Sequence, residues 1–213
     1  YDSQEKRFCN RFPAYSRIKD TYILSLFEDN FDRFWICSFN SVIVIDKKGN
    51  EIYRFDLSNG GNKQTATSKF TILSDSHILV SCFSDLIHSF ELDSQGNIAK
   101  VTEIKAPFSG LNNIMRDRNG HFWYTSDGFG LWYSEDFPTS KEDFVKVVSV
   151  GDKKMDFSKI YCILEAENGD IWIGTQAEGV LKFNPNIVES VVFSNYLAYP
   201  YRISSSFTET ADG

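Results

Sequence analysis

Three tryptophans recur at one position of a repeated sequence pattern. Trp35, Trp123 and Trp172 each follow a polar turn and lie in a short apolar run, reading FWICS, FWYTS and IWIGT. A degenerate copy has Leu79 at the tryptophan position, so the copies are separated by 44, 44 and 49 residues. A repeat of this length, with several short strands in each unit, is typical of a β-propeller blade.

Each copy divides into four short segments, which we letter A to D. Segment A is an apolar run, and a polar turn separates it from segment B. Gly120 and Gly169 stand in two of these turns, where glycine supplies the positive φ that a tight turn requires. Segments C and D are joined by a hairpin that reads Gly-Asn at 49–50 and at 96–97. The pattern predicts strand A at residues 22–27, 70–73, 113–115 and 161–164.

The repeats predict an all-β chain, a β-propeller of four four-stranded antiparallel blades. We expect these blades at residues 22–57, 70–105, 112–148 and 160–193, and the first strand of a further blade at 203–213. No linker rich in proline and glycine divides the chain, so residues 1–213 are expected to form a single propeller fragment. Closure of a propeller removes its exposed sheet edges. Four blades and part of a fifth therefore predict an arc of a larger ring, of about seven blades.

Composition excludes several partners. The 213 residues carry a formal net charge of −7, whereas nucleic-acid binding needs a basic surface. No apolar stretch is long enough to span a bilayer, so we expect no membrane contact by this segment. The sequence begins at YDSQEKRF, which favours a piece of a longer protein. The sequence has no Cys-x-x-Cys pair, so no zinc site is expected. Cys37 and Cys82 fall at matching strand positions, where a free cysteine is a small apolar filler, so we expect four unpaired thiols: Cys9, Cys37, Cys82 and Cys162.

Three of the copies resemble the two-component regulator propeller repeat. Residues 164–185, reading LEAENGDIWIGTQAEGVLKFNP, match that repeat almost throughout. Residues 115–134 match it with Tyr-Thr in place of Ile-Gly, and residues 27–46 keep Glu-Asp and Trp but lack both glycines. The Leu79 copy departs furthest from the pattern. The resemblance covers most of the chain.

This resemblance implies a function. Such repeats are best known in the periplasmic sensor regions of hybrid two-component systems of Bacteroides-type bacteria, upstream of a membrane helix and a histidine kinase. It implies a periplasmic location, an oligosaccharide ligand, and a homodimer formed through the parent receptor. The residues here contain no kinase motif. We therefore expect this segment to be a non-enzymatic sensor without a cofactor.

Most of the conspicuous residues have structural explanations. The recurring tryptophans are predicted to pack between blades, because they share one register in strand B. The Asp117–Gly120 turn lacks the further acidic ligands of a calcium loop and is predicted to be an ordinary turn. The three histidines lie in different blades or strands, so neither a metal site nor a catalytic residue is predicted. Trp132 differs, because it follows Gly130 on strand C, and it is the tryptophan most suited to an exposed role.

Propeller topology places the B–C and D–A loops on one face, and these loops vary among the copies. Variable loops on a rigid scaffold usually carry specificity. Carboxylates and amides suit hydroxyl recognition, and aromatic side chains can stack on a sugar ring. The predicted ligand-binding residues are Phe39, Asn40, Asp85, Asn112, Asn113, Asp127, Phe129, Lys159, Gln176 and Glu178.

Two other functions stay open at this point. A propeller enzyme similar to streptogramin lyases would need a general base, commonly histidine, on the loop face. His88 and His121 fall in predicted strands and not on the loop face, which disfavours the enzyme hypothesis. The third alternative is a scaffold that presents a protein-binding face.

Overall fold

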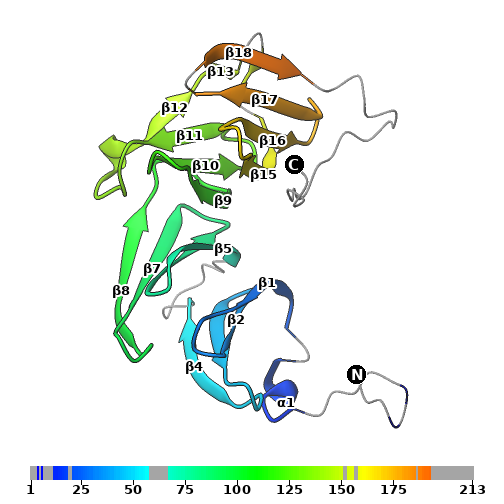
Figure 1. Ribbon diagram of the computed structural model, residues 1–213, viewed down its shortest axis with the longest axis vertical. Helices are drawn as coiled ribbons and strands as arrows, with labels where there is room; N and C mark the ends of the chain where they lie inside the picture. Colours follow the sequence, from blue (N-terminus) through cyan, green and yellow to red (C-terminus); the bar gives the residue numbers. More distant parts are fainter. Residues whose placement is uncertain are drawn as a thin grey trace. The chain divides into compact units, whose positions relative to one another are not determined.

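The computed structural model describes residues 4, 6, 12–18, 21–57, 67–150, 153–155, 158–185 and 187–192 (Figure 1). The chain divides into two compact units, Tyr1–Thr67 and Ser68–Gly213. Regular structure in the described residues is almost entirely β-strand. The exceptions are a four-residue helix, α1 (Tyr15–Ile18), and a 3-10 turn, η1 (Lys141–Asp143). No helix among the described residues has the length and apolar character needed to cross a membrane.

The first unit contains one four-stranded antiparallel sheet. Its strands lie in chain order and are β1 (Ile23–Glu28), β2 (Phe34–Ser38), β3 (Ser41–Ile45) and β4 (Glu51–Asp56). Ala14 and Ile18, in and beside α1, pack with Ile36 and Ile43 of the sheet in a small buried cluster. Helix α1 therefore covers one side of this blade.

The second unit contains three further sheets of the same kind, each again in chain order. The second blade is β5 (Thr67–Ser74), β6 (His77–Cys82), β7 (Leu86–Leu92) and β8 (Ile98–Lys105). The third is β9 (Leu111–Arg116), β10 (Phe122–Ser126), β11 (Leu131–Ser134) and β12 (Val145–Val147). The fourth is β15 (Ile160–Glu165), β16 (Ile171–Thr175), β17 (Val180–Asn184) and β18 (Ile187–Val192). A short hairpin, β13 (Ser149–Val150) with β14 (Lys153–Lys154), connects the third blade to the fourth.

The predicted all-β fold of four four-stranded antiparallel blades is confirmed. Residues 193 and 203–213, the end of the fourth predicted blade and the strand of a further blade, lie outside the described residues. The number of blades in a closed ring stays a prediction. The repeat pattern did not predict the β13–β14 hairpin or the η1 turn, because the sequences of the connections that contain them have no match in the other copies.

In the second and third blades the residue at the tryptophan position packs against the following blade, as predicted for Trp123. In the second unit Leu79 lies in a buried cluster with Leu111, Ile114 and Phe122 of the third blade. Trp123, one repeat later, is 5% exposed and lies in a cluster with residues of the fourth blade, including Ile163 and Ile173. An indole ring buries a large apolar area, so this register holds neighbouring blades together. Trp35 is fully buried and Trp172 is partly buried.

Trp132 does not have the exposed role for which it was considered. Its ring is partly buried and stacks on Phe108, with ring centroids 4.7 Å apart. The Trp132 indole N–H donates to the Phe129 carbonyl oxygen at 2.8 Å. This side chain therefore supports a loop instead of offering a free ring to a ligand.

One five-residue turn recurs five times with the same two backbone hydrogen bonds. In each copy the first N–H donates to the fifth carbonyl, and the fourth N–H donates to the first carbonyl, over 2.8–3.2 Å. The fourth residue has positive φ and is glycine in four copies, whereas Asp32 takes that conformation (φ 57°) in the first blade. Aspartate tolerates this region, so the turn survives the loss of its glycine. The copies are 29–33, 46–50, 93–97, 117–121 and 166–170.

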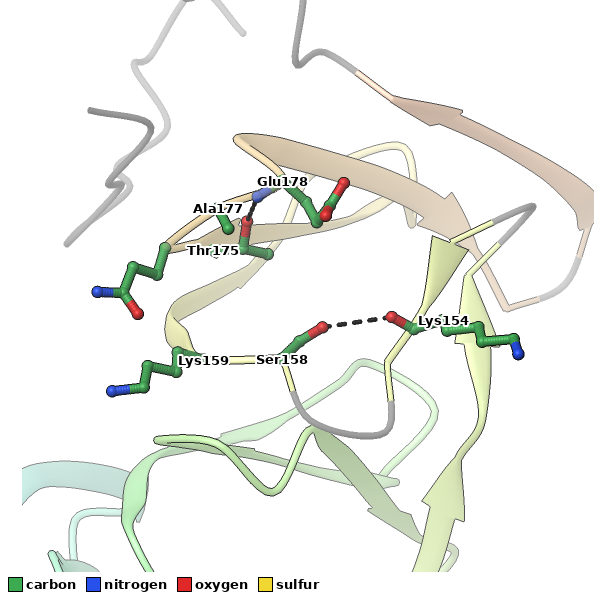
Figure 2. A pocket seen from close by; sticks show the side chains of 7 residues that line it. Lys154, Ser158, Lys159, Thr175, Ala177 and Glu178 are labelled. Atoms are coloured by element: carbon green, nitrogen blue, oxygen red, sulfur yellow. Dashed lines mark hydrogen bonds between the residues drawn. The ribbon is translucent and has the colours of Figure 1, made fainter. Parts of the chain in front are cut away.

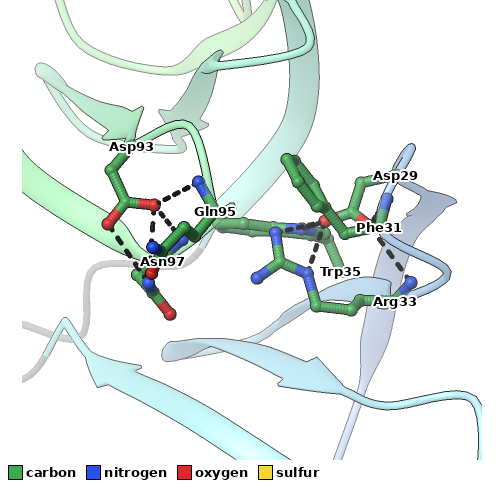
Figure 3. A network of polar contacts seen from close by, with 7 residues as sticks. All are labelled: Asp29, Phe31, Arg33, Trp35, Asp93, Gln95 and Asn97. Carbon is green, nitrogen blue, oxygen red and sulfur yellow. Dashed lines mark hydrogen bonds and ion pairs between the residues drawn. The ribbon is translucent and has the colours of Figure 1, made fainter.

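The first residue of this turn is usually an aspartate that organises it. Asp93 Oδ1 accepts the N–H groups of Gln95 and Asn97 at 2.9 and 2.8 Å (Figure 3). In two A–B turns the same carboxylate also reaches the tryptophan of strand B. The Trp35 indole donates to Asp29 at 2.7 Å, and the Trp123 indole donates to Asp117 at 2.9 Å. The Asp117 turn is thus a strand turn whose carboxylate is fully engaged.

Asp29 shows the electrostatic consequence of this arrangement. Burial raises its pKa, but hydrogen bonds from the side chains of Arg33 and Trp35 and from two backbone N–H groups outweigh burial and hold the pKa below its ordinary value. Arg33 also forms an ion pair with Asp29 at 2.6 Å (Figure 3). The carboxylate therefore stays ionised and fixes the indole in the blade.

Candidate functional site

The variable loops of the second unit form one continuous face, which we call the loop face. It comprises the B–C loops 83–85, 127–130 and 176–179 and the described parts of the D–A connections 106–110 and 148–159. Backbone hydrogen bonds of 2.7–3.2 Å join successive loops along it. These are Ala106 N to Asp85 O, Asp127 N to Gly110 O, Gly130 N to Ser158 O, and Gln176 N to Lys159 O. The loops are thus tied to one another across blades, as a rigid recognition surface requires.

A buried hydroxyl closes the B–C loops of the last two blades. Thr175 is 1% exposed; its Oγ1 donates to the Gly179 carbonyl at 2.9 Å and accepts the Glu178 N–H at 2.9 Å. Ser126 makes the equivalent bonds to Gly130 and Phe129 in the third blade. The threonine of the WIGT motif is therefore a loop anchor, which places Gln176 and Glu178 on the loop face.

This geometry predicts the effect of removing the Thr175 hydroxyl. Thr175→Val keeps the shape of the side chain but leaves the Gly179 carbonyl and the Glu178 N–H without their partner. We expect the free energy of unfolding to fall by about 1–2 kcal/mol. Urea unfolding followed by circular dichroism measures this loss. Thr175→Ser, which keeps the hydroxyl, is the matched control, and equal losses in the two variants would contradict the anchoring role.

Each B–C loop of the second unit carries one carboxylate that is ion-paired with a lysine. Asp85 pairs with Lys105 at 3.2 Å, and Asp127 pairs with Lys159 at 3.1 Å. The third pair, Glu178 with Lys153, is 3.3 Å long. A hydrogen bond from Lys159 to Asp127, and the charge of that carboxylate, raise the pKa of the lysine. The lysine of this pair therefore stays charged near neutral pH.

A cavity of about 490 Å³ opens on the loop face of the fourth blade (Figure 2). Its walls come from the end of the β13–β14 hairpin, the start of β15 and the B–C loop after β16. Figure 2 shows the Lys159 and Lys154 side chains pointing away from each other at its two ends. The lining residues are Lys154, Ser158, Lys159, Thr175, Gln176, Ala177 and Glu178.

The structure brings six of the ten predicted ligand-binding residues to this face. Lys159, Gln176 and Glu178 line the cavity. Asp85, Asp127 and Phe129 lie in the neighbouring B–C loops, and Phe129 is 45% exposed. Phe39 and Asn40 lie in the B–C loop of the first unit, where the Phe39 ring lies 6.4 Å from that of Tyr22.

The prediction that Asn112 lies in a loop was wrong, whereas Asn113 lies in the strand predicted from residue 113 and not among the loop residues. Strand β9 begins at Leu111, so both residues belong to the innermost strand of the third blade. The Asn112 side-chain amide donates to the Ile160 carbonyl at 2.8 Å and so ties this strand to the first strand of the fourth blade. Two adjacent polar residues suggested a loop, but the amide serves to join two blades.

Sequence reasoning missed one residue of the loop face. Phe83 is the first residue after β6, and Phe39 is the first residue after β2, so the two have the same position in their blades. Phe83 is 47% exposed. The shared position in the SFN and CFS loops was the signal that could have identified it. Exposed aromatic rings thus occur in the B–C loops of the first three blades, whereas the loop of the fourth has Ala177.

None of the three histidines lies on the loop face. His77 Nε2 lies 2.7 Å from the Ser89 hydroxyl, and this serine is 2% exposed and therefore closed to a substrate. His121 Nδ1 lies 3.1 Å from Asp117 in the A–B turn, and His88 is buried in β7. Within the described residues, no three side chains of the metal-ligating types come together.

Comparisons with known proteins agree with this geometry. The family model of the two component regulator propeller matches residues 155–177. No curated protein matches the chain. The extracellular domain of a hybrid two component system, BT3049 of B. thetaiotaomicron, superposes with a TM-score of 0.68 at 19% identity, covering 100% of this chain and 28% of that one.

Two other solved structures have the same fold. A protein of unknown function from Bacteroides caccae gives a TM-score of 0.56 at 14% identity, covering 82% of this chain and 62% of that chain. The WD40 β-propeller domain of Doa1 gives a TM-score of 0.50 at 15% identity, covering 76% of this chain and 49% of that chain. This chain therefore spans less than two thirds of these proteins. Residues 155–177 match the two-component regulator propeller repeat, within a chain that has the β-propeller fold.

Proposed function

We propose that this chain is part of the extracytoplasmic sensor region of a hybrid two-component system, and that its loop face binds an oligosaccharide. Binding is transmitted through the parent receptor, as a homodimer, to a cytoplasmic histidine kinase. The regulator propeller match at 155–177 and the likeness to the BT3049 extracellular domain support the sensor assignment. This segment contributes recognition, not catalysis.

The observation that carries the proposal is the composition of the loop face. Exposed phenyl rings, an amide and a cavity of about 490 Å³ lie on loops that hydrogen bonds hold in place. Aromatic faces contact the apolar C–H faces of sugar rings, while amides and ion-paired side chains exchange hydrogen bonds with hydroxyls. None of the three histidines reaches this face to act as a base, so the arrangement favours binding over lyase chemistry.

Calorimetric titration tests the proposal. The natural protein that contains this chain is titrated with a broad panel of defined plant and host oligosaccharides, and at least one is expected to bind. Gln176→Ala should weaken that binding by about tenfold, because it removes one amide from the cavity. Phe31→Ala, which truncates a 38% exposed phenyl side chain in the A–B turn of the first blade, is the control and should leave binding unchanged. Absence of heat with every sugar would contradict the proposal.

A further inference from the structure

Each carboxylate in the B–C loops of the second unit is ion-paired with a lysine, although the whole chain carries a net charge of −7. The carboxylates of the described B–C loops of the second unit are Asp85, Asp127 and Glu178, and each lies within 3.3 Å of a lysine ammonium. Two of these lysines come from the D–A connections and one from the end of β8. The pairing recurs in three successive blades, so it is a property of the face and not of one loop.

Like charges do not converge at the cavity. Lys154 and Lys159 both line it, but their side chains point to opposite sides (Figure 2). Lys159 is already paired with Asp127, and Glu178 is paired with Lys153. A ligand carboxylate or sulfate that bound Lys159 would have to displace or approach the Asp127 carboxylate. That approach costs electrostatic free energy, and the Lys154 side chain, which points away from Lys159, is not placed to offset it.

Apolar rings stand beside these pairs. Phe83 lies two residues before Asp85, and Phe129 lies two residues after Asp127. The rings are 47% and 45% exposed, which is a large apolar surface to leave in water on loops held by hydrogen bonds. Their π faces can stack on an uncharged ring, and the remaining N–H groups and carboxylate lone pairs of the neighbouring ion pairs can exchange hydrogen bonds with hydroxyl groups.

We propose that the ligand of the loop face is an uncharged oligosaccharide that stacks on Phe83 and Phe129, and that the lysine–carboxylate pairs select against acidic sugars. This inference rests on the proposed function and specifies its ligand class. The discrimination comes from charges that are neutralised before the ligand arrives. Neutral hydroxyls can still exchange hydrogen bonds with these paired groups, whereas an anion meets three lysines that are already paired with carboxylates.

The experiment compares neutral oligosaccharides with their uronic-acid counterparts of the same length, by calorimetry on the natural protein. The neutral member of a pair should bind at least about tenfold more tightly, and its affinity should change less than about twofold between 50 and 500 mM NaCl. Phe83→Ala should weaken binding of the neutral sugar by about fivefold, with Phe31→Ala as the matched control. Asp127→Asn removes the partner of Lys159 and should reduce the ratio of the affinities for the neutral and the acidic sugar by about tenfold.

The outcomes separate the two proposals. The uncharged-ligand inference would be overturned if the uronic-acid sugar bound more tightly and in a salt-sensitive way. It would also be overturned if Asp127→Asn left the selectivity between the two sugars unchanged. Neither result would contradict the proposed sensor function. Binding of a neutral sugar that Phe83→Ala does not affect would also overturn the uncharged-ligand inference. Failure of every sugar in both series to bind would overturn both.

Discussion

Replacement of Trp123 by alanine is expected to lower the stability of the second unit by about 4 kcal/mol. The indole is 5% exposed and packs against Tyr133 and Phe183, with ring centroids 4.9 and 5.3 Å apart. Phe183 belongs to the fourth blade, so truncation opens a cavity between two blades. It also removes the N–H donor that Asp117 accepts at 2.9 Å.

Hydrogen exchange localises this loss. In a repeat architecture stability is approximately a sum of unit and interface contributions, so protection should fall most in β15, β16 and β17. The amides of β2, in the other unit, serve as the internal control. Trp123→Leu should cost less than the alanine variant, because Leu79 fills this register in the second blade. If hydrogen exchange showed the same loss of protection in every blade of Trp123→Ala, the role of the indole as an interface residue would be contradicted.

The sequence was sufficient to predict the blades because the repeat is a local signal. Alternating apolar residues, positive-φ glycines and one tryptophan register each act within about ten residues, and their recurrence sets the number of blades. Asp32 shows the limit of that signal, since the turn at 29–33 keeps its geometry without glycine. The β13–β14 hairpin lies in a connection with no repeated counterpart, so no internal comparison could predict it.

The candidate site was predictable as a face but not as a set of contacts. Topology alone places the B–C loops together, which is why six of the ten residues lie on the loop face. The ion pairs were not predictable, because Asp127 and Lys159 lie 32 residues apart and meet only through the register of two blades. Asn112 was misplaced for the same reason: its partner, the Ile160 carbonyl, comes from the next blade.

The largest effect of pH is expected from His88. This side chain is 4% exposed in β7, and burial lowers its pKa from 6.5 to about 4. An unfolded chain binds a proton at His88 below pH 6.5, whereas the native state does so only below about pH 4. Stability is therefore fully present above pH 6.5 and falls as the pH drops toward 4, by about 3 kcal/mol in total. Burial lowers the pKa of His77 as well, which adds to the loss in the same direction.

Urea unfolding of the second unit between pH 7.5 and 4.5 measures this loss. The carboxylates whose pKa values hydrogen bonds lower, such as Asp29 and Asp170, lose their stabilising contribution only as the pH falls below about 4, so they do not account for a loss at higher pH. His88→Leu places an apolar side chain at this buried position of β7 and removes the titrating group, so most of the pH dependence of stability above pH 4.5 should vanish in this variant. A variant that loses as much stability as the natural protein over this range would show that the burial of His88 is not the cause. Because β7 lies within the blade and not on the loop face, the same variant should bind its ligand normally at pH 7.5, which separates the acid sensitivity of the fold from recognition.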